Sequence, residues 1–198
     1  MDKYSSGLVS ESFWFIEFKK FMQLRYDGNS WDTIKSLCLK ENLLGISKEY
    51  RAARIYKYLK NRVESLEQDI YIIFLKSDLS TQKTINLFAV LKRNRLFFEF
   101  LYEVYREKNL LGVMELSDKD INIFFKHKQQ QNEDVAVWAD VTLKRLRSSY
   151  INFMIEAGLL KPNGKQKLIS PPVLDVAFEN YLKSKGEIRI IKAITGVD

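Results

Sequence analysis

Apolar positions recur every three or four residues along most of the chain, which is the spacing of an amphipathic helix packed on a core. Ala52, Ile55, Leu59 and Val63 form one such stripe. A longer stripe near the C-terminus contains Leu143, Leu146, Tyr150, Phe153, Met154 and Ala157. Glycine and proline are sparse, with eight and three residues in 198, so the chain lacks the turn density of a β protein. We therefore expect a mainly all-α fold.

The first 65 residues contain the start and stop signals of three helices. Ser10 can cap a helix that Gly28 ends near Asp27, and Ser30 can cap a second, short helix. A turn around Gly45 follows, and Ser47 can cap a third helix. Helix, short turn and basic helix is the order of a helix-turn-helix motif, although any small helical bundle can produce it. We predict a helix-turn-helix-like domain over residues 1–65.

Residues 66–116 are expected to form a scaffold of strongly apolar helices. This block carries seven basic and seven acidic residues, so it is electrically neutral. Its most apolar run, Ile70 to Leu75, is far shorter than the roughly 20 residues that span a bilayer. We expect no membrane association.

Residues 117–198 carry the pattern of a winged helix. Ser117 and Asp120 form a capping-box pattern that opens a helix to about Lys128, and a further helix runs from Asp140 or Thr142 to Gly158. Two short β-prone runs then flank Pro162-Asn163-Gly164, a strong hairpin signal. A plain hairpin on a helical domain is the alternative. A helix from Pro172 to about Lys185 and a final strand over residues 187–195 complete the predicted domain.

Basic charge is concentrated in two segments. Residues 47–62 hold six basic groups and one acidic group, and so do residues 144–167. Each segment is therefore +5, so the rest of the chain sums to −3 within a total of +7. A solvated basic face explains either segment alone, but their coincidence with two DNA-binding patterns favours contacts with phosphates. The predicted nucleic-acid-binding residues are Lys48, Arg51, Arg54, Tyr58, Arg62, Lys144, Arg145, Ser148, Asn152, Lys161, Lys165 and Lys167.

Catalytic and metal-binding patterns are missing from the sequence. The sole cysteine, Cys38, lies in an apolar row that favours a buried structural thiol, and it fits a reducing cytoplasm. The sole histidine, His127, has no cysteine or histidine nearby in the sequence, too few ligands for a structural zinc site. Glycine-rich phosphate loops are absent as well. We expect a cytoplasmic, non-enzymatic protein with no cofactor and no metal.

Four stretches of the chain resemble the BrxA family, the small accessory proteins of BREX bacteriophage-resistance systems. The resemblance covers roughly residues 4–160 and is most specific up to Arg62; the C-terminal portion matches less distinctly. It is carried by KYSSGLVSESFWFIEFKKFMQL, SWDTIKSLCLKENLLGISKEYRAARIYKYLKNRV, LSTQKTINLFAVLKRNRLFFEFLYEVYREK and VAVWADVTLKRLRSSYINFMIEAGLL.

The resemblance implies a DNA-binding protein that works beside other BREX proteins, and it carries over no catalytic residue. Together with the charge pattern it predicts double-stranded DNA as the partner, contacted mainly through phosphates. Two alternatives remain open at this stage. One is a NusB-like RNA-binding or antitermination-type factor, a comparison that has been made for the family. The other is a structural adaptor within the defence complex.

Overall fold

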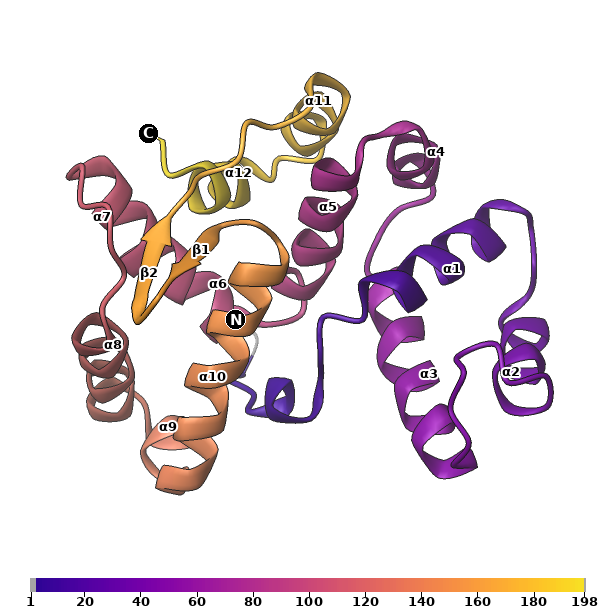
Figure 1. Ribbon diagram of the computed structural model, residues 1–198, viewed down its shortest axis with the longest axis horizontal. Helices are drawn as coiled ribbons and strands as arrows, with labels where there is room; N and C mark the ends of the chain where they lie inside the picture. Colours follow the sequence, from indigo (N-terminus) through magenta and orange to yellow (C-terminus); the bar gives the residue numbers. More distant parts are fainter. Residues whose placement is uncertain (1–2, 198) are drawn as a thin grey trace. The chain divides into compact units, whose positions relative to one another are not determined.

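The computed structural model describes residues 3–197, and helices dominate this part of the chain, as the sequence predicts (Figure 1). Its contacts divide it into two compact units. One unit runs from Trp14 to Arg93, and the other combines the residues up to Phe13 with those from Asn94 onward. We call these the middle unit and the split unit. The predicted boundaries after residues 65 and 116 fall inside them, and the predicted three-part division stays a prediction.

The middle unit is entirely helical. Its first helix begins at Phe15 rather than at Ser10, because Ser10 ends a short 3-10 turn and Trp14 takes a left-handed conformation with φ of 45°. Ser30 and Asp78 cap the second and fifth helices by accepting backbone N–H bonds from Thr33 and Thr81. The helices are α1 (Phe15–Tyr26), α2 (Trp31–Leu39), α3 (Glu49–Glu64), α4 (Asp69–Lys76) and α5 (Leu79–Leu91).

The split unit holds the other helices and a small sheet. Its core is aromatic: Tyr150 stacks on Phe97 with ring centroids 4.4 Å apart and also contacts Phe100 and Phe125. The elements are η1 (Gly7–Ser10), α6 (Arg95–Phe100), η2 (Leu101–Tyr105, a π-helix), α7 (Arg106–Leu110), α8 (Asp118–Gln131), α9 (Glu133–Ala136), α10 (Asp140–Glu156), β1 (Leu160–Asn163), β2 (Gln166–Ile169), α11 (Val176–Ser184) and α12 (Ile188–Thr195).

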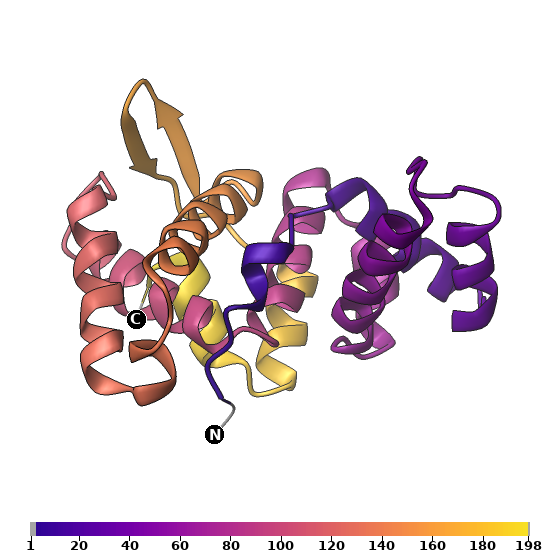
Figure 2. The same ribbon diagram turned by 90° about the horizontal axis from the view of Figure 1, so that it is seen from below.

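The predicted hairpin and capping box are confirmed. Strands β1 and β2 pair antiparallel, and Gly164 turns between them with φ of 59°, a conformation that favours glycine (Figure 2). An isolated bridge from Glu115 to Leu168 extends this pairing on the outer side of β2. Ser117 and Asp120 cap α8 reciprocally, so α8 starts where the sequence predicts.

The predicted final strand is wrong, because residues 188–195 form helix α12. Isoleucines 188 and 190 flank Arg189 and imitate the alternation of a strand. However, the buried positions 190, 191, 193 and 194 follow helical spacing, and Gly196 ends the helix in a left-handed conformation. Helix α11 likewise begins at Val176 after an Asp175 cap, four residues later than predicted.

A half-buried ion cluster ties the N-terminal segment to the helices of the split unit. Lys128 Nζ lies 2.6 Å from Glu99 Oε2 and 2.7 Å from Glu103 Oε1. Arg95 Nε donates to Glu99 Oε1 at 2.7 Å, and the Tyr4 hydroxyl donates to Glu99 Oε2, also at 2.7 Å. Glu99 therefore connects α6, α8 and the chain start.

This cluster predicts a stability that falls at both extremes of pH. Burial raises the pKa of Glu99, but hydrogen bonds from Lys128, Arg95 and Tyr4 outweigh it and hold that pKa below its ordinary 4.5. Its stabilisation is thus complete above pH 4.5 and is lost as the pH falls through the folded-state pKa. Burial lowers the pKa of Lys128, but bonds to Glu103 and Glu99 raise it above 10.5, so its contribution is lost only above that pH.

Urea unfolding measured from pH 3 to pH 11 tests this expectation, and Lys128→Met provides the comparison. The variant removes the cation that both carboxylates contact, so its free energy of unfolding should change less steeply with pH at both extremes. An unaltered pH profile in Lys128→Met would contradict the expectation.

Candidate nucleic-acid interface

The first candidate surface is the outward face of α3 in the middle unit. Lys48, Arg51 and Arg54 are exposed, as the sequence predicts. Tyr58 is half-buried and stacks on Trp14 with ring centroids 5.9 Å apart, so only part of its ring faces solvent. Three of the five predicted residues on this helix therefore present their charge freely to solvent.

Two exposed residues of this face are absent from the residues predicted from the sequence to bind nucleic acid. Tyr50 is 70% exposed, and Lys57 is also exposed. At 100° per residue, positions 50, 54, 57 and 61 lie opposite the buried stripe, whereas Arg51 and Tyr58 lie toward its edge. Both residues are identified by their angle around the helix axis from the apolar stripe, whereas rows of arginine do not include them. We define Lys48, Tyr50, Arg51, Arg54 and Lys57 as the α3 surface.

Arg62 is not part of this surface, and its prediction as an exposed contact is wrong. Its side chain is 1% exposed, and its Nη1 donates to Asn86 Oδ1 at 3.2 Å. The guanidinium also lies 5.9 Å from the Trp14 ring centroid. On the helix it stands about 20° from Ile55, next to the apolar stripe, so it points into the middle unit.

A rigid turn orients α3 against α2. Asn42 and Gly45 both have positive φ, of 52° and 67°, and Asn42 Oδ1 accepts the backbone N–H of Ile46 at 2.6 Å. Lys20 Nζ donates to the Leu43 carbonyl at 2.9 Å, which fixes the same turn to α1. Cys38, on α2, is buried, and burial raises the pKa of its thiol to about 11. A thiol in this state is a structural group rather than a nucleophile.

The second candidate surface is a groove in the split unit, with a volume of about 420 Å³. It lies among α8, α10 and β2, and it brings together four residues predicted from sequence: Lys144, Ser148, Asn152 and Lys167. Its other lining residues are Asp118, Ile121, Asn122, Arg147 and Ile151. We call this the α10 groove. Arg147 was missed by the sequence analysis because it adjoins the buried stripe, where its guanidinium packs 5.5 Å from the Phe125 ring centroid.

The remaining predicted residues of the split unit lie outside this groove. Arg145 is exposed on α10 but does not line the groove, and Lys161 and Lys165 are exposed on the hairpin. Within the groove, Lys167 Nζ lies 2.8 Å from Asp118 Oδ1, so the charge of Lys167 is partly neutralised. The free cations on this side are therefore centred on Lys144 and the hairpin.

Metal binding and membrane insertion each require a particular arrangement of residues. No group of three or more His, Cys, Asp or Glu residues is arranged to hold a metal ion among residues 3–197. His127 is exposed and lines a different pocket from the α10 groove. No helix in the described residues is long and apolar enough to cross a membrane.

The two surfaces belong to a mainly helical protein with a basic helix in one unit and a basic groove beside a hairpin in the other. Comparisons with known proteins place the chain in a family. The BrxA family profile matches residues 2–186. The BREX protein BrxA of Bacillus cereus strain H3081.97 is 34% identical over 184 residues, covering 93% of this chain and 92% of that protein. The chain belongs to the BrxA family.

The fold also occurs in a solved structure of low sequence similarity. An uncharacterized protein from Magnetospirillum magneticum superposes with a TM-score of 0.84 over 99% of this chain and 100% of its own, at 18% identity. This similarity supports the fold alone. Family membership supports a role as a component of a BREX system.

Proposed function

We propose that this protein is a non-catalytic, double-stranded-DNA-binding component of a BREX phage-defence system, acting in the cytoplasm. The observation that carries the proposal is the exposure of the α3 surface. Four cations are solvent-accessible within ten residues: Lys48 at the N-cap of α3, and Arg51, Arg54 and Lys57 on the helix itself. Such a density of unpaired positive charge repels itself in isolation and is stabilised by the phosphates of a nucleic acid.

A helix-turn-helix role for α2 and α3 is supported by their connection. The Asn42–Gly45 turn is held by side-chain bonds, so α3 is presented in a fixed orientation with its basic face outward. In helix-turn-helix proteins the second helix enters the major groove, and its N-terminal residues contact base edges. Arg51 and Arg54 occupy the first turns of α3, where such contacts are made.

A winged-helix role for the split unit is supported by the order of its elements. Helix α7, the Glu115 bridge, α8, the short α9, α10 and then the β1–β2 hairpin follow one another in the chain. In our proposal α10 is the helix that approaches DNA, and the hairpin is the wing. Lys161 and Lys165 on the hairpin would then contact the backbone beside the groove that α10 faces.

Salt dependence tests whether the split unit takes part in DNA binding. The logarithm of affinity falls with the logarithm of salt, with a slope of about 0.9 per neutralised phosphate on B-DNA. Lys144→Ala with Lys165→Ala should reduce that slope by up to about two, measured by titrating a duplex at several salt concentrations.

The matched control is Lys183→Ala, which removes an exposed cation from α11, away from both the groove and the hairpin. Its slope should equal that of the parent protein. If both variants keep the parent slope and affinity, the split unit is not a DNA-contacting surface, and binding must come from the α3 surface alone.

RNA is the second candidate ligand, and the exposure of Tyr50 favours it. A freely accessible aromatic ring among cations can stack on an unpaired base, as in proteins that bind single strands. Competition between duplex DNA and a structured RNA with unpaired loops, at one salt concentration, separates the two. Preferential binding of the RNA, lost in Tyr50→Ala, would replace DNA as the proposed ligand.

A further inference from the structure

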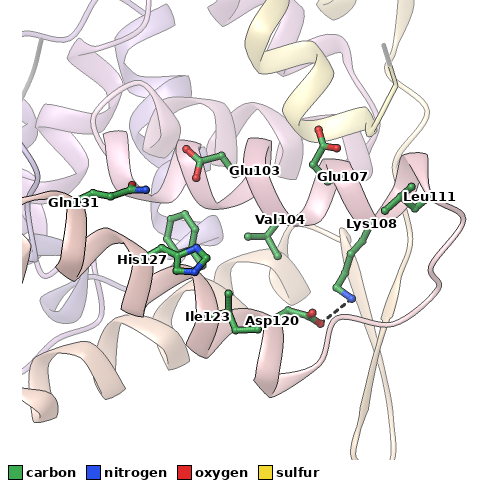
Figure 3. A pocket seen from close by; sticks show the side chains of 10 residues that line it. Glu103, Val104, Glu107, Lys108, Leu111, Asp120, Ile123, His127 and Gln131 are labelled. Atoms are coloured by element: carbon green, nitrogen blue, oxygen red, sulfur yellow. Dashed lines mark ion pairs between the residues drawn. The ribbon is translucent and has the colours of Figure 1, made fainter.

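A second pocket of the split unit lies between the helical segment η2–α7 and helix α8, and its character differs from that of the α10 groove. Its volume is about 380 Å³. Figure 3 shows Val104 from one segment facing Ile123 and His127 from the other, with the Lys108–Asp120 ion pair at one end. The lining is completed by Glu103, Glu107, Leu111, Phe124 and Gln131. We call it the α8 pocket.

Large apolar side chains are exposed at this pocket. Leu111 is 77% exposed and Ile123 is 43% exposed, and both line it. The loop that carries Leu111 also exposes Val113 and Met114. Exposed apolar groups that gather at a hollow and are surrounded by polar residues indicate an interaction surface, because leaving them in water has a free-energy cost.

The charge that this pocket presents to a partner is negative. Glu103 and Glu107 line it, and their side chains are 46% and 53% exposed. The cations that pair with them, Lys128 and Arg106, are buried and do not line the pocket. A partner therefore meets the carboxylates, whose charge the buried cations neutralise only in part, so this surface favours basic side chains over the phosphates of a nucleic acid.

The backbone on one side of the pocket is irregular. Residues 101–105 form a π-helix within the helical stretch that continues from α6 to α7. A π-turn is rare and occurs frequently at functional sites. Here it supplies both Glu103 and Val104, so one carboxylate and one apolar side chain of the pocket come from the same turn.

We propose that the α8 pocket docks a segment of another protein of the same BREX system, in which a large apolar side chain is flanked by lysine or arginine. The apolar side chain packs against Val104, Leu111 and Ile123. Its basic neighbours reach the carboxylates of Glu103 and Glu107. This surface would join the protein to its complex while the basic surfaces of the proposed function remain available to DNA.

A pair of synthetic helical peptides tests the chemistry of the pocket. One has leucines at helical spacing with lysines between them, and the other replaces every lysine with glutamate. With methyl-labelled protein, the leucine–lysine peptide should shift the NMR signals of Val104, Leu111 and Ile123. The leucine–glutamate peptide should bind at least about tenfold more weakly. Equal binding of the two, or no shift at those methyls, overturns the proposal.

Purified proteins of the same BREX system, titrated one at a time, then test the partner. One of them should bind, and Leu111→Ser with Ile123→Ser should weaken that binding at least about tenfold. Val173→Ser with Val176→Ser is the matched control, since both valines are exposed but lie outside the pocket. It should leave the affinity unchanged, and DNA affinity should be unchanged in both variants.

Three outcomes contradict the proposal. The first is that none of the BREX proteins binds. The second is that one binds and its affinity is the same for Leu111→Ser with Ile123→Ser as for the parent. The third is that sedimentation shows these changes to dissociate a homodimer. In the last case a second copy of this chain is the occupant. Circular dichroism on each variant separates these outcomes from loss of the fold.

Discussion

Replacing Arg62 with alanine should lower the free energy of unfolding by about 2–4 kcal/mol, the range for removing one partner from a buried charged hydrogen-bond network. The side chain is among the largest fully buried groups in the described part of the chain, and it contacts both Asn86 and Trp14. Alanine leaves a cavity and removes the donor to Asn86 Oδ1, which is itself buried. Urea unfolding followed by circular dichroism measures the change.

Lys57→Ala on the same helix is the matched control, because Lys57 is exposed on the α3 surface. It should change stability by no more than about 0.5 kcal/mol. It should weaken DNA binding, whereas folded Arg62→Ala should bind DNA as the parent does. The reverse pattern, a stable Arg62→Ala that no longer binds, would return Arg62 to the contact surface.

The starts of α2 and α8 were predictable from local chemistry alone. Ser30 and Ser117 accept the first free N–H groups of their helices, and Asn163-Gly164 supports the positive φ of a tight hairpin. These signals depend on neighbours within four residues. They therefore survive without knowledge of the tertiary fold.

The prediction of a final strand was wrong because the structure of that segment depends on tertiary contacts rather than on local signals. The run at positions 187–195 contains both an alternating and a helical apolar pattern, and a short β-branched run fits either. Its contacts decide between them: α12 packs on η2, α7 and α11, so four residues on one helical side become buried. No local property of residues 187–195 specifies that those surfaces are available.

The candidate site was predictable in its location and less so in its members. Counting charges along the chain identified the segments that form α3, α10 and the hairpin, because residues 47–62 and 144–167 each hold six basic groups and one acidic group. It did not separate Arg62, which is in the core, from Lys57, which is in solvent. The difference is an angle of about 140° around the helix axis, which a count of charges does not contain.

The α8 pocket could not be found by such a count. Its carboxylates and apolar groups are separated by up to 21 residues, and Glu103 and Glu107 lie in the block of residues 66–116, which is electrically neutral as a whole. Only the folded arrangement buries Lys128 and Arg106 while leaving Glu103 and Glu107 exposed. Which charged side chains the pocket exposes is thus determined by the tertiary fold.

Reversing the charge of Arg51 and Arg54 together should give the largest loss of DNA affinity. At about 0.15 M salt each phosphate contact contributes roughly 0.7 log units through counterion release, so losing two contacts weakens binding by about 30-fold. Glutamate adds repulsion, so Arg51→Glu with Arg54→Glu should exceed that factor. Both side chains are exposed, and the free energy of unfolding should change by less than about 1 kcal/mol.

The control is Lys19→Glu with Lys35→Glu, which makes the same change in net charge on α1 and α2 of the same unit. It should weaken binding by much less, because long-range attraction is screened over about 8 Å at physiological salt. If the two double variants lose affinity equally, net charge alone governs binding and α3 is not a contact surface. If Arg51→Glu with Arg54→Glu binds as the parent does, the α3 surface is a solvated basic face, and the proposed function loses the observation that carries it.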